Sequence, residues 1–482
     1  MTSASPGELA AKIVHRLQRA GFTAFWVGGC VRDFLLGREP QDFDIATDAR
    51  PEQIEKLFKR TVAVGRKFGV IVVVEDGHHF QVATFRSEEN YADGRRPAKV
   101  IFADARADAL RRDFTVNGLF YDPTTGKIKD WVGGESDLRS GILRAIGPPE
   151  ERFAEDHLRL LRAVRLAAQL GFEIEPRTFS AIRSLASKIK LISAERIRDE
   201  LIKLFAPPTG GAGGPPSAAH PANGDTARGV ARPAAPAARG LMLLRESGLM
   251  EHVLPELGAT ISCDQSPDYH PEGTVFEHIR RMLERMPPGA SPSLPWAAIL
   301  HDIGKPAAAS RDEATGQIHF YEHEKIGAVM AEGILRRLRF PRRQIDEIVA
   351  CVRQHMQFKD VKQMRTATLR RLLLRETFPL ELELHRLDCL GSHGSLAHYD
   401  FLVAAAAALK KQPTIRPPLL AGADLIALGM TPGPAMGSLL REIREKQLQD
   451  ELKTPRQARS WAKKRLHEAS SAAATGRRQN KD

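Results

Sequence analysis

The sequence predicts an α+β protein in which a mixed α/β domain at the N-terminus is followed by helical domains. Up to about residue 148, short runs of β-branched residues alternate with stretches of helical spacing. After Pro148, apolar residues recur at helical spacing through most of the chain. The exception is the segment 207–239, where proline, glycine and alanine fill 23 of 33 positions. Such a segment buries too little apolar surface to offset its ordering entropy, so we predict a flexible insertion there.

Two neighbouring strands are predicted in the N-terminal domain. Val70–Val74 consists entirely of β-branched residues, and Glu75–Gly77 after it has the composition of a turn. Phe80–Phe85 is expected to pair with the first strand. The helical part is expected to begin with a helix from Phe153 to Leu170 that ends at Gly171.

Two further helices are expected before the insertion, over Pro176–Ile189 and from Ser193, a plausible N-cap, through Phe205. Helical patterning resumes at Leu241. The predicted parts are therefore an α/β domain at 1–148, a helical segment at 149–206, the insertion at 207–239, a helical domain at 240–400 and a basic helical tail at 401–482.

Composition excludes several classes of protein. The chain has 482 residues, 42% hydrophobic and 27% charged, which is typical of a soluble protein of roughly three domains. No apolar run approaches the roughly 20 residues of a membrane helix, and no secretory signal pattern opens the sequence. The cysteines are few, far apart and without a C-x-x-C pair, which argues against a disulfide framework or a zinc ribbon. We expect a cytoplasmic protein, and nothing implies an obligate protein partner.

The net charge is +12, and half of it lies in the last 32 residues, where nine lysines and arginines face three acids. A polyanion such as RNA would be attracted to this tail. A solvated tail without a partner is the alternative interpretation.

The strongest chemical signal is a pair of glycines followed by a pair of aspartates. Gly28 and Gly29 allow backbone N–H groups to approach phosphates, and Arg32 has the fork geometry that binds a phosphate. Asp42 and Asp44 are two residues apart, so on a strand both side chains leave the same face. Two carboxylates there would share magnesium ions, which assist an attacking hydroxyl and a leaving pyrophosphate.

Residues 26–48 resemble the head of the class II tRNA nucleotidyltransferase (CCA-adding enzyme) and bacterial poly(A) polymerase family. The resemblance continues in the R-R-D-F-T-V-N-G motif at 111–118 and the E-D-H-L-R motif at 155–159. It implies a polymerase-β-like head, Mg²⁺ held by Asp42 and Asp44, tRNA as the partner, and CTP and ATP as substrates. The nucleotide-binding positions that it implies are Gly28, Gly29, Arg32, Arg112, Asp113, Asp156, Arg159, Arg162 and Arg165.

The resemblance also assigns base reading to Asp156 and Arg159, and the chemistry of the bases agrees. Cytosine and adenine each present an amino donor beside a ring acceptor, whereas uracil and guanine present a carbonyl in place of that amino group. A carboxylate and a guanidinium three residues apart on a helix can therefore accept C and A and reject U and G. The alternative is a surface salt bridge between the two side chains.

Gln81 departs from the family pattern, because many members carry glutamate at that position. Asp42 and Asp44 would then be the remaining metal carboxylates, and we expect the enzyme to stay competent. Residues 64–70 resemble in part a signature of poly(A) polymerases, but the Gly-Val-Ile-Val-Val run from Gly69 is closer to the CCA-adding version. We favour full CCA addition, with A-only, CC-only or poly(A) synthesis as alternatives.

A second constellation centres on His301 and Asp302, which are adjacent and follow an apolar stretch. The order H…HD…H…H…D resembles the HD phosphohydrolase superfamily. It implies a transition-metal site, phosphatase or cyclic-phosphodiesterase action on RNA ends or nucleotides, and a phosphate contact from Lys305. A phosphohydrolase with a degenerate head and a non-catalytic RNA-binding protein are the competing hypotheses. The predicted ligands are His278, His301, Asp302, His323, His355 and Asp388.

Overall fold

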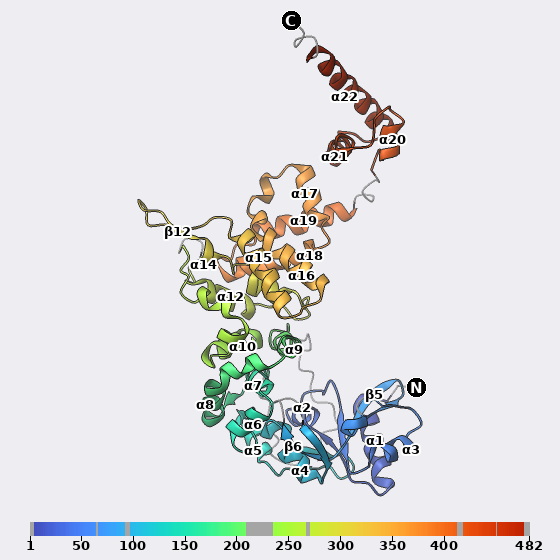
Figure 1. Ribbon diagram of the computed structural model, residues 1–482, viewed down its shortest axis with the longest axis vertical. Helices are drawn as coiled ribbons and strands as arrows, with labels where there is room; N and C mark the ends of the chain where they lie inside the picture. Colours follow the sequence, from blue (N-terminus) through green and yellow to red (C-terminus); the bar gives the residue numbers. More distant parts are fainter. Residues whose placement is uncertain are drawn as a thin grey trace. The chain divides into compact units, whose positions relative to one another are not determined.

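The computed structural model describes residues 4–63, 66–91, 97–208, 235–266, 270–411, 418–449 and 451–476. The chain divides into two compact units, Met1–Val349 and Ala350–Asp482. Figure 1 colours the chain from blue at the N-terminal head to red at the C-terminal helices. The two units are described separately below.

The head is built on a seven-stranded mixed sheet in the order β3-β4-β5-β2-β1-β8-β9. Only β2 and β5 run parallel, and the remaining neighbours are antiparallel. This arrangement puts β2 beside β1 near the centre of the sheet. The strands are β1 (Ala24–Val27), β2 (Asp44–Thr47), β3 (Thr61–Val62), β4 (Val70–Glu75), β5 (His78–Thr84), β8 (Phe120–Asp122) and β9 (Lys127–Lys129).

The predicted hairpin is confirmed. β4 and β5 pair in antiparallel register from Val70↔Ala83 to Glu75↔His78. Asp76 (φ 47°) and Gly77 (φ 81°) make the turn, and both have positive φ, which explains why a glycine follows the aspartate. A second hairpin, β6 (Arg86–Tyr91) with β7 (Pro97–Phe102), follows directly.

The head's helices pack beside the sheet. α1 begins with a capping box between Ser5 and Glu8 and buries its apolar face, including Leu9 and Ile13, next to β1. Phe25, Phe85 and Phe120 form an aromatic core on the sheet. The helices are α1 (Pro6–Arg19), α2 (Gly29–Leu35), α3 (Pro51–Leu57), α4 (Ala105–Leu110) and α5 (Gly134–Ser140), with 3-10 turns at Arg66–Phe68 and Thr115–Asn117.

The expectation of one helix from Phe153 to Leu170 is wrong. The chain forms α6 (Pro149–Glu155) and α7 (Leu158–Leu170), and Asp156 between them is extended (φ −150°, ψ 104°). The Asp156 side chain accepts the backbone N–H of Leu158 at 3.0 Å, which caps the start of α7 in place of a continuous helix. Gly171 ends α7 in the left-handed conformation (φ 78°), as predicted.

The rest of the helical segment 149–206, called the neck below, follows the sequence pattern with two differences. α8 (Pro176–Leu185) ends earlier than expected and continues as a 3-10 turn, Ala186–Leu191. Ser193 is the N-cap of α9 (Ala194–Leu204), as predicted. The insertion was expected to reach residue 239, but α10 (Pro236–Glu246) already begins at Pro236. Residues 209–234 lie outside the described part of the chain.

The first unit continues with a small helical domain around Trp296, which is buried against Phe205 and Phe340. Short strand pairs join parts of this unit, β10 (Ile142–Leu143) with β11 (Glu173–Ile174) and β12 (Ala309–Arg311) with β13 (Ile318–Phe320). The helices are α11 (Met250–Val253), α12 (Val275–Glu284), α13 (Leu294–Leu300), α14 (Lys305–Ala308) and α15 (His323–Arg337), with a 3-10 turn at Pro255–Thr260. The boundary between the two units falls within α16 (Arg342–Gln354), after Val349.

The described residues of the second unit form helices joined by loops, with no strand among them. One core gathers around Phe358 and Phe378, and another around Leu425 and Ile443. No helix in the described part of the chain is long and apolar enough to cross a membrane. The helices are α17 (Thr366–Leu373), α18 (Phe378–Gly391), α19 (Ala397–Lys411), α20 (Gly422–Ile426), α21 (Pro434–Leu448) and α22 (Pro455–Gly476), with a 3-10 segment at His355–Gln363.

Candidate active site

The diglycine turn joins β1 to α2 and is crowded by an arginine. Gly28 has φ 76°, a conformation that glycine adopts without strain. A Cβ on Gly28 would lie 3.0 Å from Nη1 of Arg112, so a larger residue would push that guanidinium away. Arg32, one turn into α2, donates from Nη1 to Oδ1 of Asn117 at 2.7 Å. The turn therefore forms one wall of an arginine-lined site.

The two aspartates flank a buried aromatic residue. Phe43 packs on Trp26 with ring centroids 4.8 Å apart, whereas Asp42 and Asp44 on either side of it are exposed. The expectation that both aspartates lie on the strand is only half right, because β2 begins at Asp44. Partial burial of the Asp44 carboxylate raises its pKa. The charge of Arg112 lowers the pKa of Asp44, and the charge of Asp42 raises it further. The carboxylates are thus close enough to interact electrically.

Gln81 lies directly beside this pair. In the parallel register of β2 and β5, Gln81 is the Cα partner of Asp44, and the Gln81 side chain is exposed. The position at which many relatives carry glutamate is therefore adjacent to the aspartate pair, and in this chain it carries no charge.

A buried aspartate, which sequence reasoning missed, holds two arginines of the R-R-D motif. Asp108 is 2% exposed and receives Arg111 Nη2 at 2.6 Å and Arg112 Nη2 at 2.9 Å. The three residues lie at i, i+3 and i+4 across the end of α4, a spacing that would have indicated the contact. Asp108 orients both guanidinium groups before any ligand binds.

Asp113 anchors the other side of the R-R-D motif to the neck. Arg162 of α7 donates to Oδ2 of Asp113 from Nε at 2.9 Å and from Nη2 at 2.7 Å, and Asn117 Nδ2 donates to Oδ1 at 3.1 Å. Burial alone would raise the pKa of Asp113. The charge of Arg162 and the hydrogen bond from Asn117 outweigh that effect and hold the pKa of Asp113 well below its usual value. This ion pair links head and neck.

Asp156 and Arg159 are not paired with each other, so the surface salt bridge is not what the structure contains. Asp156 Oδ2 accepts from Arg196 of α9 at 2.6 Å. Arg159 donates from Nη1 to the Arg152 carbonyl at 2.8 Å and contacts Glu155. Because Asp156 precedes α7, the expectation that both residues share a helix face is wrong. Arg196 was missed because nothing in the sequence links positions 40 residues apart.

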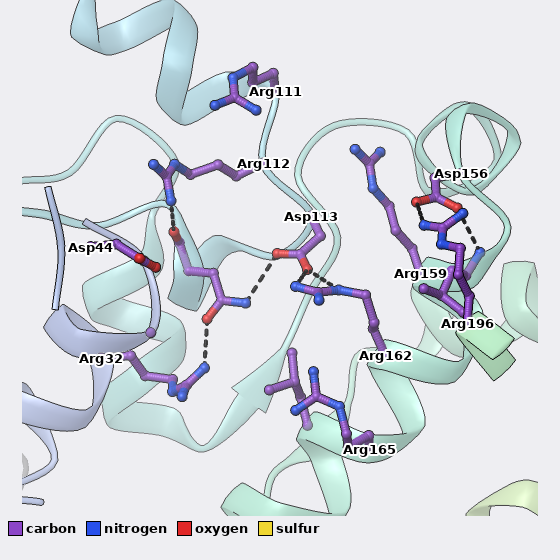
Figure 2. A pocket seen from close by; sticks show the side chains of 15 residues that line it. Arg32, Asp44, Arg111, Arg112, Asp113, Asp156, Arg159, Arg162, Arg165 and Arg196 are labelled. Atoms are coloured by element: carbon purple, nitrogen blue, oxygen red, sulfur yellow. Dashed lines mark hydrogen bonds and ion pairs between the residues drawn. The ribbon is translucent and has the colours of Figure 1, made fainter. Parts of the chain in front are cut away.

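All nine predicted nucleotide-binding residues line one cavity of about 470 Å³ (Figure 2). Asp44 comes from the head, whereas Asp156 and Arg159 come from the neck, and Figure 2 shows the side chains that line the cavity. Seven arginines and three aspartates line it, an excess of positive charge that suits a polyanion. The lining residues that were not predicted are Arg111, Asn117, Leu158, Leu166 and Arg196.

The first unit also contains a buried cluster of histidines around Asp302. Asp302 is 2% exposed, and its two oxygens lie 3.1 Å from Nε2 of His301 and 3.3 Å from Nε2 of His323. The ring of His278 lies 5.3 Å from that of His301, centroid to centroid. Lys305, expected to meet phosphate, is buried and donates to Asp302 at 2.7 Å.

The donor set of this cluster suits a metal ion. His301 directs Nδ1 to the Ala298 carbonyl at 3.0 Å and His323 directs Nδ1 to the Phe320 carbonyl at 2.8 Å. A ring whose Nδ1 donates in this way carries its lone pair on Nε2, the usual arrangement of metal-binding histidines. Both Nε2 atoms lie beside the buried Asp302 carboxylate. Imidazole with carboxylate is a ligand set of transition metals.

His355 and Asp388 belong to the second unit. His355 is buried and directs Nδ1 to the Val352 carbonyl at 2.7 Å, so its tautomer matches those of His301 and His323. Asp388 lies on α18. Their part in a metal site stays a prediction.

Three family models match the chain. Residues 24–144 match the poly A polymerase head domain, and residues 171–213 match a probable RNA- and SrmB-binding site of polymerase A. Residues 269–390 match the HD domain. The chain therefore contains a poly A polymerase head domain and an HD domain. Nucleotidyltransferase and HD families are metal-dependent.

Curated relatives of this chain are named CCA-adding enzymes. Those of Staphylococcus aureus strains MRSA252 and Mu3 are 45% identical over 199 residues, which is 41% of this chain. The matched part of the chain spans 50% of the length of these curated relatives.

Solved structures share the fold. The Bacillus stearothermophilus CCA-adding enzyme, solved in complex with CTP, is 27% identical with a TM-score of 0.72, covering 97% of this chain and 100% of that one. The Thermotoga maritima CCA-adding enzyme is 17% identical with a TM-score of 0.55, covering 96% and 97%, a likeness of fold alone. The predicted α+β architecture, with a nucleotidyltransferase head and helical remainder, is confirmed.

Proposed function

We propose that this chain builds or repairs the 3′-terminal CCA of tRNA without a template, using CTP and ATP and releasing pyrophosphate. One observation carries the proposal: a single cavity contains Asp44 of the head and both Asp156 and Arg159 of the neck. A nucleotide in that cavity would have its phosphates near the metal-type carboxylate and its base near the two groups that distinguish bases. The match to CCA-adding enzymes supports the same reading.

The head's side of the cavity has the chemistry of a triphosphate site. Arg32 and Arg112 flank the diglycine turn, and their orientation is fixed by Asn117 and Asp108. Fixed guanidinium forks bind phosphate oxygens at little further entropic cost. Asp44 in the cavity lining and Asp42, which is close to it in sequence but outside the lining, offer exposed carboxylate oxygens, the ligands that Mg²⁺ prefers. Mg²⁺ bound there would activate the primer hydroxyl and stabilise the leaving pyrophosphate.

The neck's side of the cavity would read the base. Asp156 Oδ1 accepts from the Leu158 backbone and Oδ2 from Arg196, which leaves each oxygen a second lone pair for an amino group. Arg159 is held by Glu155 and the Arg152 carbonyl and lines the same cavity. The Asp156 carboxylate would accept a hydrogen bond from the amino group of cytosine or adenine, and the Arg159 guanidinium would donate one to the neighbouring ring nitrogen. Uracil and guanine would place a carbonyl against the carboxylate.

The deciding experiment uses tRNA ending at its discriminator base, with CTP alone, ATP alone or both, followed by sequencing of the 3′ ends. We expect CC with CTP alone, CCA with both, and no extension with ATP alone. Long A tails with ATP alone would instead identify a poly(A) polymerase. Addition of C only, or of A only to ends that already carry CC, would identify a specialised enzyme.

A variant pair tests the site itself. Asp44→Ala should lower CMP incorporation by about three orders of magnitude, the size of effect seen when a group that stabilises the transition state is lost. Asp199→Asn is the matched control, because Asp199 lies on α9 with its side chain 55% exposed and paired to Arg198, outside the cavity lining. Undiminished incorporation by Asp44→Ala would refute the assignment.

The buried histidine cluster supports a second activity, hydrolysis of phosphate esters on RNA ends by the HD domain. His301, Asp302 and His323 come together in a buried position, and imidazole with carboxylate is a ligand set of transition metals. Hydrolysis of 2′,3′-cyclic phosphate ends in the presence of Mn²⁺ or Co²⁺ should be lost in His301→Ala. Hydrolysis without any nucleotide incorporation would favour the alternative of a degenerate head.

A further inference from the structure

Glu272 is a buried carboxylate beside the histidine cluster that none of the recognised motifs includes. Its side chain is 0% exposed. Oε1 lies 2.6 Å from Nδ1 of His278 and 2.9 Å from Nδ1 of His270. Among the residues that the structure describes, Glu272 Oε2 has no hydrogen-bond partner. One carboxylate oxygen therefore serves two imidazole rings.

The contact fixes the tautomer of His278. An ionised carboxylate only accepts hydrogen bonds, so Nδ1 of His278 carries the proton and Nε2 carries the lone pair. His301 and His323 reach the same tautomer through backbone carbonyls. His278 uses a charged acceptor instead, which makes its Nε2 the more basic ligand.

A second route leads from Glu272 to Asp302. Because Nδ1 of His270 donates to Glu272, Nε2 of His270 is an acceptor, and it lies 3.4 Å from Nζ of Lys305. The same Nζ lies 2.6 Å from Oε1 of Gln265 and 2.7 Å from Oδ2 of Asp302. Three acceptors match the three protons of the ammonium group, so Lys305 is held in one orientation against Asp302.

We propose that Glu272 is the positioning residue of the HD metal site, orienting His278 directly and Asp302 through His270 and Lys305. Glu272 itself would touch neither metal nor substrate. This inference rests on the metal site proposed above for the histidine cluster. It adds a buried carboxylate that orients two of the predicted ligands, His278 and Asp302, at the same time.

The test is Co²⁺ binding by the full-length protein, followed by calorimetry and by the visible absorption of the bound ion. Glu272→Gln keeps the shape of the side chain but presents a donor as well as an acceptor to the two rings. We expect it to weaken Co²⁺ binding by about 10- to 100-fold and to change the absorption spectrum. Glu277→Gln is the matched control, because Glu277 lies on the same helix as His278 but pairs with Arg280. It should bind Co²⁺ as the wild type does.

Two further variants separate the possible failures. His301→Ala removes a ligand, and if it binds Co²⁺ as the wild type does, the metal site itself is refuted and the inference with it. If His301→Ala loses binding while Glu272→Gln keeps wild-type affinity and spectrum, only the inference is overturned. Glu272→Asp retains the charge, so it should recover most of the affinity. Equal losses in the Gln and Asp variants would mean that Glu272 only fills space. CMP incorporation by each variant reports that the head remains folded.

Discussion

The arginine-lined cavity and the histidine cluster lie in the same unit but differ in how far their side chains are exposed to solvent. Asp44 is exposed and Arg162 is 35% exposed, whereas His301 and Asp302 are 1% and 2% exposed. In the cavity, positive charge exceeds negative charge around a volume of about 470 Å³. In the cluster, imidazoles surround one carboxylate. The first site suits a large anionic ligand that arrives from solvent, and the second suits a single small cation.

The comparison also extends to how each site is held in place. The cavity's arginines are positioned by aspartates, Arg112 by Asp108 at the end of α4 and Arg162 by Asp113 of the head. The cluster's histidines are positioned by backbone carbonyls and by Glu272. Removing a supporting group should therefore destabilise the head–neck junction in the first site and alter metal binding in the second.

The largest effect on stability is expected for Asp113→Asn, which removes the 2.7 Å ion pair with Arg162 and leaves Arg162 only a 3.9 Å contact with Glu200. The free energy of unfolding should fall by about 2 kcal/mol at pH 7, the usual cost of orphaning a partly buried charged group. Urea unfolding at pH 7 measures it, with Asp199→Asn as the control. A loss no larger than that of the control would show that this ion pair does not hold head and neck together.

Lowering the pH should reduce the difference in unfolding free energy between the wild type and Asp113→Asn. The folded-state pKa of Asp113 is lowered, so its contribution is complete above its unfolded pKa of about 4 and is lost as the pH falls toward the folded value. The gap in unfolding free energy between wild type and Asp113→Asn should therefore narrow from pH 7 to pH 3. A gap that stays constant contradicts this assignment.

Asp156→Asn should change which nucleotide is used without unfolding the protein. An amide donor can face the carbonyl of uracil, so kcat/KM for CTP should fall by about 10- to 100-fold while UTP gains relative to it. Single-nucleotide incorporation with each of the four triphosphates measures the ratio. If all four fall in proportion, Asp156 does not read the base.

Arg196→Met should have a smaller effect on the preference for CTP over UTP than Asp156→Asn. The substitution removes the 2.6 Å ion pair that holds Asp156, and the preference for CTP over UTP should drop by about tenfold, the worth of one hydrogen bond to a charged group. The exposed Arg139 provides the control Arg139→Met. An unchanged preference would mean that Asp156 is oriented by the Leu158 backbone alone.

The smallest effect is expected for Gln81→Glu. The new carboxylate would lie beside Asp44 across the strand register, close to where Mg²⁺ is proposed to bind. Interactions of exposed charges are worth less than about 1 kcal/mol, so the Mg²⁺ concentration for half-maximal incorporation should fall by about threefold. No change, or a rise, would show that this strand position does not face the metal.

The sequence predicted the members of the cavity better than their contacts. The family resemblance implied all nine of the predicted nucleotide-binding residues, and all nine line one cavity. Arg196 escaped notice because its contact with Asp156 joins two helices. The helix break at Asp156 escaped notice because no proline or glycine marks it. In the cluster, Glu272 could not be predicted, because only the fold brings it between His270 and His278.

The most direct measurement of the central claim is a crystal structure with CTP and Mn²⁺, in which anomalous scattering locates the metal. The account predicts Mn²⁺ between Asp42 and Asp44, and the cytosine amino group within hydrogen-bond distance of Asp156. Manganese found only at the histidine cluster, or cytosine bound outside the arginine-lined cavity, would contradict it.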